Sequence, residues 1–187
     1  MRYFVFYIYL SVIALTFWKC QPILKAPVAA IMSATLPTPE IDTTTNKHSF
    51  PKADFNLYVK DLKGKIINMS DYRGKVIFLN FWATWCMPCV AELPSINKMF
   101  LELKDENIAF LLISNEAIEK VKAYHSKKDY QIPFHIIDDE GNIPNIYFSP
   151  SIPTTFIINK EGNIIRKSFG AEDWDDAAFI DELRKLL

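Results

Sequence analysis

The chain has 187 residues, 50% of them hydrophobic, and a formal net charge of −1 at pH 7. This length is sufficient for one domain with a full hydrophobic core plus an additional segment. The near-neutral charge gives no electrostatic reason to expect a nucleic acid or an acidic substrate. Three cysteines are too few for a disulfide scaffold, which excludes the small disulfide-rich class.

An uncharged apolar run over residues 3–18 follows Met1 and Arg2 and ends at Lys19. As a helix these 16 residues would span about 24 Å, slightly less than the roughly 30 Å hydrocarbon core of a bilayer. Aromatic residues at its ends and a snorkelling Lys19 could supply the difference. We favour an uncleaved N-terminal membrane anchor over residues 1–19.

Two other interpretations of this segment remain open. A cleaved signal peptide would fit the apolar run, with a cleavage site near Ala30. Lipid attachment at Cys20 is the other, although the large residues before this cysteine depart from a lipoprotein box. All three interpretations place the rest of the chain outside the cytoplasm.

Residues 20–50 are rich in proline, and 38–49 are mostly Thr, Pro, Asp, Asn and Lys. Such a composition cannot bury much apolar surface, so it predicts a flexible linker. The folded domain is therefore expected over residues 51–187.

The domain begins with an alternating segment, 55–60, which turns into 66–69 and predicts a β-hairpin. Apolar periodicity then predicts buried strands separated by helices, and a final hairpin before a closing helix that Asp173 would cap. This order predicts an α/β sandwich on a mixed sheet. His135 falls within a strand, where we expect it to be packed and hydrogen-bonded. Strands are expected at 76–82, 108–114, 134–137, 154–159 and 164–169. One helix is expected from just after Cys89 to Leu103, and further helices are expected at 116–128, 142–147 and 173–187.

Two cysteines stand where the strand 76–82 is followed by a helix, in the string Cys86-Met87-Pro88-Cys89. The first turn of a helix has unpaired N–H groups and the positive end of the macrodipole, so it stabilises a thiolate. Cys86 should therefore have a lowered pKa and act as a nucleophile. Cys89 lies one helical turn further on, within reach of Cys86 for a disulfide.

A zinc site is the alternative use of such a cysteine pair, but it needs about four ligands. The third cysteine is distant, and the three histidines are isolated without ligand spacing. We therefore predict a redox site with no metal and no separate cofactor.

The string around these cysteines resembles the thioredoxin superfamily. With Glu92 and Pro94 it forms the pattern WCxPCxxExP, which resembles the TlpA/ResA-like branch of tethered extracytoplasmic thiol–disulfide oxidoreductases. The resemblance covers residues 50–187 and includes a later Pro-Thr-Thr that begins at Pro153. It implies a thioredoxin-like sandwich, a mixed central sheet flanked by helices, with an extra N-terminal hairpin.

The resemblance also implies that Pro153 is cis and packs beside the cysteines. The backbone of Ile152 would then pair with an extended client strand by β-augmentation. We place Trp85, Met87, Pro88, Ile152 and Pro153 at the client-binding surface.

Glu92 follows Cys89 by three residues and so shares its helix face. It is either an ordinary exposed glutamate or a partly buried carboxylate that raises the thiol pKa and transfers protons during exchange. Asn80 stands where thioredoxin itself has a buried aspartate, and the family that the chain resembles pairs this asparagine with the glutamate. We favour the proton-transfer role, and we expect Pro94 to kink the helix.

These residues predict a dithiol–disulfide cycle in which Cys86 attacks a client disulfide and Cys89 resolves the mixed disulfide. Disulfide-containing envelope proteins are the expected clients, but the sequence does not identify the client: apocytochrome c, a sporulation or envelope protein and a broad set of misoxidised proteins all remain open. A membrane electron donor would re-reduce the pair, and reduction is favoured because the family mostly reduces. A thiol peroxidase would need a Pro-x-x-x-Thr-x-x-Cys string, and a copper-delivery protein would need wider cysteine spacing and a nearby histidine; neither pattern is present.

Overall fold

A computed structural model describes residues 36–39, 51–137 and 143–187. The predicted anchor 1–19, Cys20, most of the linker 20–50 and the turn 138–142 lie outside the described residues. Within the described ranges, none of the helices has the length and apolar character that a bilayer crossing requires. The proposed division into anchor, linker and domain therefore stays a prediction.

Seven strands form one mixed sheet in the order β2-β1-β5-β4-β3-β6-β7. The central strands β3, β4 and β5 are parallel, and the other neighbours are antiparallel. The predicted mixed α/β fold is confirmed, and β1 with β2 forms the additional N-terminal hairpin. The strands are β1 Tyr58–Asp61, β2 Ile66–Asn68, β3 Val76–Phe81, β4 Ile108–Ser114, β5 Phe134–Ile136, β6 Thr154–Ile158 and β7 Ile164–Phe169.

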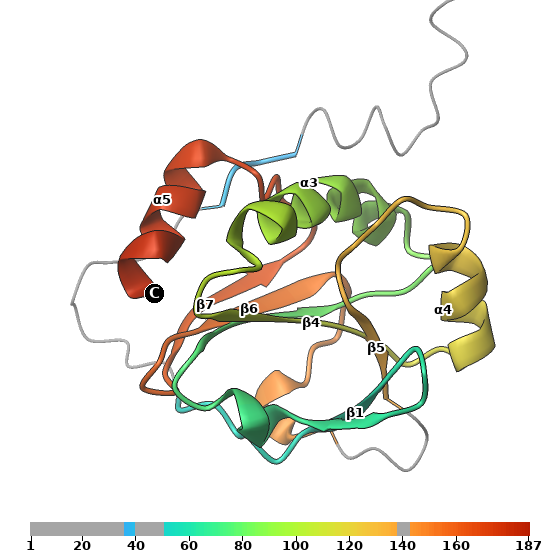
Figure 1. Cartoon of the computed structure of the whole chain (residues 1–187), viewed down its shortest axis with the longest axis horizontal. Coiled ribbons are helices and arrows are strands. Elements are labelled where there is room, and N and C mark those ends of the chain that lie inside the picture. Colours follow the sequence, from blue (N-terminus) through green and yellow to red (C-terminus); the bar gives the residue numbers. More distant parts are fainter. Residues whose placement is uncertain (1–35, 40–50, 138–142) are drawn as a thin grey trace, which may run out of the picture.

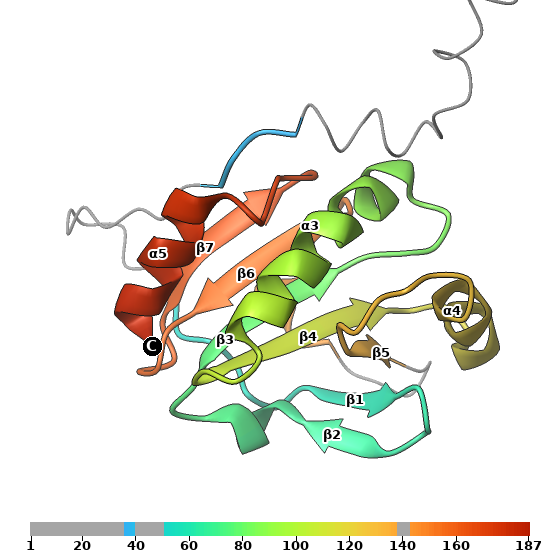
Figure 2. The ribbon, with the colours of Figure 1, turned by 45° about the horizontal axis from the view of Figure 1, so that its top comes forward.

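Helices α3 and α5 lie across one face of the sheet, and α4 lies near the β5 end (Figures 1 and 2). Side chains of all three helices belong to the same apolar cluster on this face. The opposite face is covered by residues 53–57 and two short 3-10 helices. The helices are α3 Met87–Leu103, α4 Ile118–His125 and α5 Ala177–Leu186, with 3-10 helices η2 Met69–Tyr72 and η3 Asn145–Tyr147.

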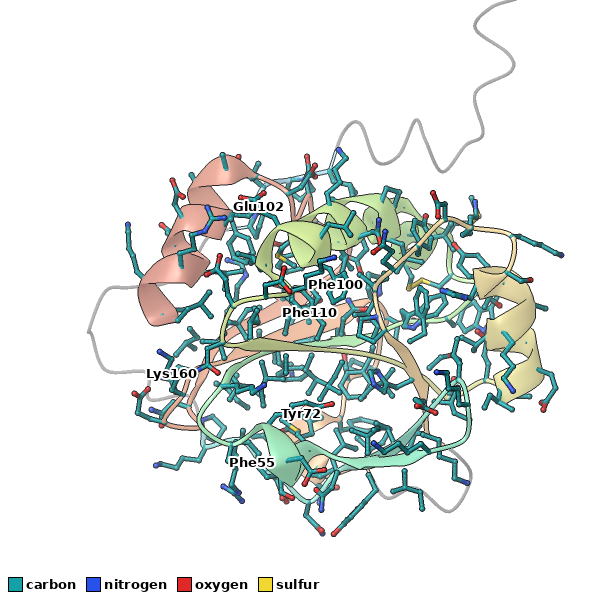
Figure 3. The ribbon with its side chains drawn as sticks, in the orientation of Figure 1. Phe55, Tyr72, Phe100, Glu102, Phe110 and Lys160 are labelled. Carbon is teal, nitrogen blue, oxygen red and sulfur yellow. A yellow bond between two sulfur atoms is a disulfide. The ribbon has the colours of Figure 1, made fainter. Side chains whose placement is uncertain are left out.

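Aromatic side chains fill both layers. Phe100 of α3 meets Phe110 of β4 edge to face, with ring centroids 5.3 Å apart. Phe55 and Tyr72 lie on the other side of the sheet (Figure 3). Because β3 is buried along its whole length, it forms the centre of the domain and fixes the position of the loop that follows Phe81.

Several predicted helix boundaries were wrong. The helix expected at 116–128 ends at His125, and the one expected at 142–147 is a 3-10 helix that begins at Asn145. The closing helix begins at Ala177, because Asp176 rather than Asp173 accepts a hydrogen bond from the N–H of Phe179 at 3.0 Å. Helix α4 begins at Ile118 instead of Glu116, since the Glu116 side chain is engaged with another loop, as described below. Helix α3 runs without a break through Pro94, so the predicted kink there remains untested.

Four residues of the predicted linker, 36–39, lie against the domain beside α5 (Figure 1). The carbonyl oxygen of Pro37 accepts a hydrogen bond of 2.7 Å from the N–H of Asp173. The segment before the domain therefore contacts the connection between β7 and α5.

Candidate active site

Cys86 and Cys89 are joined by a disulfide at the N-terminus of α3, with an S–S distance of 2.12 Å. Cys86 is the N-cap of this helix, and the N–H of Cys89 lies 3.3 Å from the Cys86 sulfur. Pro88 lies in the first turn of α3, where a backbone N–H would have no partner within the helix, so its absence removes no helical hydrogen bond. A Cys86 thiolate would thus sit at the positive end of the helix with an N–H directed at it.

The two sulfurs differ in their access to solvent. Cys89 is fully buried, whereas Cys86 keeps 6% of its surface exposed and lies between the exposed side chains of Trp85 and Met87. Trp85 is 65% exposed and Met87 45%. Of the two cysteines, therefore, only Cys86 contacts solvent.

The peptide bond between Ile152 and Pro153 is cis, which confirms the prediction. The carbonyl oxygen of Ile152 lies 3.7 Å from the Cys86 sulfur. The carbonyl of Pro153 accepts a hydrogen bond of 2.9 Å from the N–H of Gly170, which attaches this loop to the end of β7. The cis-proline loop therefore lies directly beside Cys86.

A cavity of about 240 Å³ opens next to the disulfide and is lined mainly by apolar side chains. Trp85 and Ile152 form its border near Cys86, and Phe148 forms part of its wall. Phe148 is 73% exposed, and sequence analysis missed it because no periodic pattern covers 148–150. These side chains form a mainly apolar, partly exposed surface next to Cys86, of the kind that binding sites often have.

Glu92 lies on the inner side of the disulfide, and none of its surface is exposed. One oxygen accepts a hydrogen bond of 2.9 Å from the Asn80 amide. The other accepts one of 2.9 Å from the indole N–H of Trp174 and one of 3.3 Å from the backbone N–H of Glu172. The alternative of an exposed glutamate is therefore excluded, and Glu92 is more deeply buried than expected.

Burial raises the pKa of Glu92 from 4.5 to about 8. The hydrogen bonds from Trp174, Asn80 and the Glu172 backbone act in the opposite direction, because they stabilise the carboxylate, while the charge of Glu172 raises the pKa. A carboxyl with such a pKa can both give and accept a proton near neutral pH.

Glu116 is a second carboxylate that sequence analysis did not assign to the site. Its oxygens accept hydrogen bonds from the backbone N–H of Thr84 at 2.6 Å and from the Thr84 hydroxyl at 2.9 Å. Lys120 forms an ion pair with the same group. Burial acts to raise the pKa of Glu116, but the bonds from Lys120 and Thr84 lower it overall. Glu116 is thus a carboxylate that holds the loop leading to Cys86.

His135 is buried in β5, as expected, but its Nδ1 has no hydrogen-bond partner among the described residues. The expectation of a hydrogen-bonded ring is therefore not met at this atom. Burial lowers the pKa of His135 to about 4, so the ring is neutral at pH 7.

Comparison with known proteins gives a consistent result. The AhpC/TSA family model matches residues 49–167. A relative called thiol-disulfide oxidoreductase ResA from Bacillus cereus is 34% identical over 118 residues, which is 63% of this chain and 68% of the relative. The protein of the same name from Bacillus subtilis is 33% identical over 112 residues, or 59% of this chain and 62% of that protein.

Solved structures show the same architecture. The pneumococcal exposed lipoprotein thioredoxin Etrx1 from Streptococcus pneumoniae superposes with a TM-score of 0.58 at 28% identity, covering 72% of this chain and all of that chain. The thioredoxin domain of a thiol-disulfide oxidoreductase from Bacteroides vulgatus gives a TM-score of 0.61 at 19% identity, covering 74% of this chain and all of that domain. The similarity to the Bacteroides vulgatus domain concerns the fold alone.

Proposed function

The chain belongs to the AhpC/TSA family, as a ResA-like thiol–disulfide oxidoreductase, and from this premise we propose that it reduces disulfides of client proteins outside the cytoplasm. One observation carries the proposal. The Cys86–Cys89 disulfide lies at the N-terminus of a helix, with Cys86 the less buried of the two cysteines and next to the cis-proline loop.

The reaction begins with the reduced protein. The Cys86 thiolate attacks one sulfur of a client disulfide, forms a mixed disulfide and releases the other client sulfur as a thiolate, which takes up a proton. The Cys89 thiolate then attacks the Cys86 sulfur, forms the Cys86–Cys89 disulfide and releases the second client thiol. Two electrons pass to the client, so a membrane electron donor must restore the dithiol. No separate cofactor takes part.

Glu92 supplies the proton chemistry that this sequence of steps needs. Cys89 is fully buried and must lose its proton before it can attack. Glu92 lies one turn further along the same face of α3, and its pKa of about 8 suits an acceptor at neutral pH. In this mechanism Glu92 takes the Cys89 proton and later returns it during re-reduction.

The client would bind along the apolar surface next to Cys86. Trp85, Met87 and Pro88 are exposed at the tip of α3, and the backbone of Ile152 beside Pro153 would pair with an extended client segment. We include apocytochrome c among the candidate clients. An N-terminal anchor over residues 1–19 would keep the domain at the membrane, close to its electron donor.

Reduction of insulin disulfides with dithiothreitol as electron source tests the proposal. Cys86→Ser should abolish the activity, because serine is not a nucleophile toward sulfur under these conditions. Cys20→Ser in the same full-length chain is the matched control and should keep it. Retained activity in Cys86→Ser would overturn the assignment of the nucleophile. Consumption of peroxide by the purified chain, or tight copper binding at the cysteine pair, would favour a peroxidase or a copper-delivery protein instead.

A further inference from the structure

Among the described residues, every recorded hydrogen-bond partner of the Glu92 carboxyl group is a donor. They are the Asn80 amide, the indole N–H of Trp174 and the backbone N–H of Glu172. An indole N–H can only donate. Its hydrogen bond to a carboxylate is stronger than its hydrogen bond to the carbonyl oxygen of a protonated acid, so Trp174 favours the ionised form of Glu92. Among these groups, the Asn80 side chain alone has both a donor and an acceptor.

Trp174 is held firmly in this position. Its backbone N–H donates a hydrogen bond of 3.1 Å to the Ser95 hydroxyl, which in turn donates one of 2.8 Å to the Glu92 carbonyl oxygen. Its ring packs against Phe78 and Phe179, with centroids 5.0 and 5.4 Å away. Trp174 is fully buried, so its N–H cannot turn away from Glu92 without disrupting this packing.

The catalytic role that we assign to these contacts depends on the proposed function. We propose that Trp174 is a positioning residue of the exchange reaction, whose indole N–H holds the Glu92 carboxyl group beside Cys89 and selectively stabilises its ionised form. Burial alone drives a carboxyl group toward the neutral acid. The indole counteracts this effect and keeps Glu92 able to ionise in the pH range where Cys89 must give up its proton.

Asn80 has the complementary role. Its amide nitrogen donates to Glu92 and to Thr155, each at 2.9 Å, while its oxygen has no partner among the described residues. When Glu92 takes up a proton, the new O–H needs an acceptor. A rotation of the Asn80 amide would provide its free oxygen as that acceptor. Trp174 can therefore only donate to Glu92, which favours the carboxylate, whereas Asn80 can also accept a hydrogen bond from the protonated acid.

The charged groups on the segments packed around Glu92 come from α3, β7 and the connection to α5, and the charge of Glu172 acts on Glu92 itself. Glu172 pairs with Arg166 of β7 at 2.7 Å, and both side chains are mostly buried. Asp175 in the same connection pairs with Lys98 of α3, and the pKa of Asp173 is raised to about 6, first by its hydrogen bond to Asp175. Strands β3 and β6 present the neutral side chains of Asn80 and Thr155. Helix α3 also contributes the two cysteines, which are titratable groups in the reduced chain.

The test uses the full-length chain with its disulfide closed, so that the cysteines do not titrate. The carboxyl ¹³C resonance of Glu92 reports its titration, and Glu92→Gln assigns the signal. Trp174→Phe should move the midpoint upward by about 1 to 2 pH units, the size expected for the loss of one hydrogen bond to a charged group. Phe179→Leu is the matched control, because it disturbs the same aromatic packing and removes no bond to Glu92.

A second readout links this effect to the cysteines. In the reduced chain, the pH profile of Cys86 alkylation should change in Trp174→Phe, but the same substitution should have no effect in a Glu92→Gln background. If Trp174→Phe does not fold, benzothienylalanine at position 174 retains two fused rings without the N–H and should give the same shift. An unchanged Glu92 midpoint in a folded variant overturns the proposal.

The two proposals fail in different ways. If Cys86→Ser keeps full insulin reduction while Trp174→Phe still moves the Glu92 midpoint, the reductase mechanism is wrong and the Trp174–Glu92 coupling remains. If insulin reduction depends on Cys86 while Phe179→Leu moves the midpoint as much as Trp174→Phe, general packing controls Glu92 and Trp174 has no specific role.

Discussion

The two sides of the disulfide differ in chemistry and in exposure. On the outer side, Trp85, Met87 and Phe148 present apolar surface to solvent beside the Cys86 sulfur. On the inner side, Glu92 and its side-chain partners Asn80 and Trp174 have no access to solvent. In the mechanism that we propose, a single turn of α3 separates the surface that binds a client from the carboxyl group that transfers protons.

This difference has energetic consequences. Exposed apolar side chains contribute little to folding, so changes on the outer side should alter client binding alone. Buried polar groups are costly unless they are fully hydrogen-bonded, so changes on the inner side should alter both stability and pH dependence. The following predictions probe this contrast, beginning with the largest effect.

Cys89→Ala removes the sulfur that connects the two sides. The Cys86 thiolate can still attack a client, but nothing resolves the mixed disulfide, so multiple turnover should fall to background and covalent adducts should accumulate. Non-reducing gels after exposure to a disulfide-bonded client measure this result. A gel without adducts would contradict the role of Cys89 as the resolving thiol.

Glu92→Gln tests the inner side. Because the folded-state pKa of about 8 exceeds the ordinary 4.5, the unfolded chain ionises first as pH rises. The contribution of Glu92 to folding is greatest below pH 4.5 and is lost as the pH rises from 4.5 through 8, by on the order of 5 kcal/mol in total and about 3 kcal/mol between pH 5 and pH 8. Denaturant unfolding of the oxidised chain at pH 5 and pH 8 should show this decline in the wild type and a flatter profile in Glu92→Gln.

Glu102→Gln provides a matched control on the same helix. Glu102 is an exposed residue that pairs with Arg184, and surface ion pairs contribute little to stability. Its substitution should leave the pH dependence of unfolding unchanged. An equally flattened profile in this variant would show that Glu92 does not cause the decline.

Trp85→Ala tests the outer side. The loss of a large exposed aromatic contact should raise the KM for a protein client about 5- to 30-fold, equivalent to 1 to 2 kcal/mol. The unfolding free energy should hardly change, because Trp85 is mostly exposed. Reduction of a small-molecule disulfide serves as the control reaction, and an equal loss of rate there would contradict a role in client binding.

Glu116→Gln should have the smallest effect. Glutamine retains one acceptor for Thr84 but loses the charge and the second acceptor, so the loop before Cys86 should be held less firmly. We expect a decrease in insulin reduction of less than about 10-fold, or below 1.4 kcal/mol. Glu119→Gln on the exposed surface of α4 is the matched control, and a similar decrease there would remove any specific role of Glu116.

Part of this contrast was predictable from the sequence. The strand-to-helix position of Cys86 and Cys89 predicted their disulfide, since residues three apart lie one helical turn apart. The motif around Pro153 predicted its cis bond through family resemblance. Of the partners of Glu92, only Asn80 was predictable from the sequence. Trp174 was not, because it comes 82 residues after Glu92 and no local pattern relates these two residues.

The local sequence pattern was also insufficient to place a helix start where several neighbouring residues were equally suitable caps. Asp173, Asp175 and Asp176 are all suitable N-caps for the closing helix. The structure selects Asp176, because Asp175 pairs with Lys98 and the N–H of Asp173 bonds to Pro37. These competing partners are distant in sequence, so helical periodicity could not decide between the three aspartates.

The sequence by itself determined the alternation of strands and helices, the hairpin at the start of the domain and the cysteine pair at a helix tip, because these features depend on residues close together in the chain. Only the tertiary structure decided that Glu92 is fully buried, that Trp174 and Asn80 donate to it, and that Glu116 holds Thr84. The physical reason is that burial and long-range hydrogen bonds arise when distant segments pack together, and this packing sets the proton affinity of a carboxyl group.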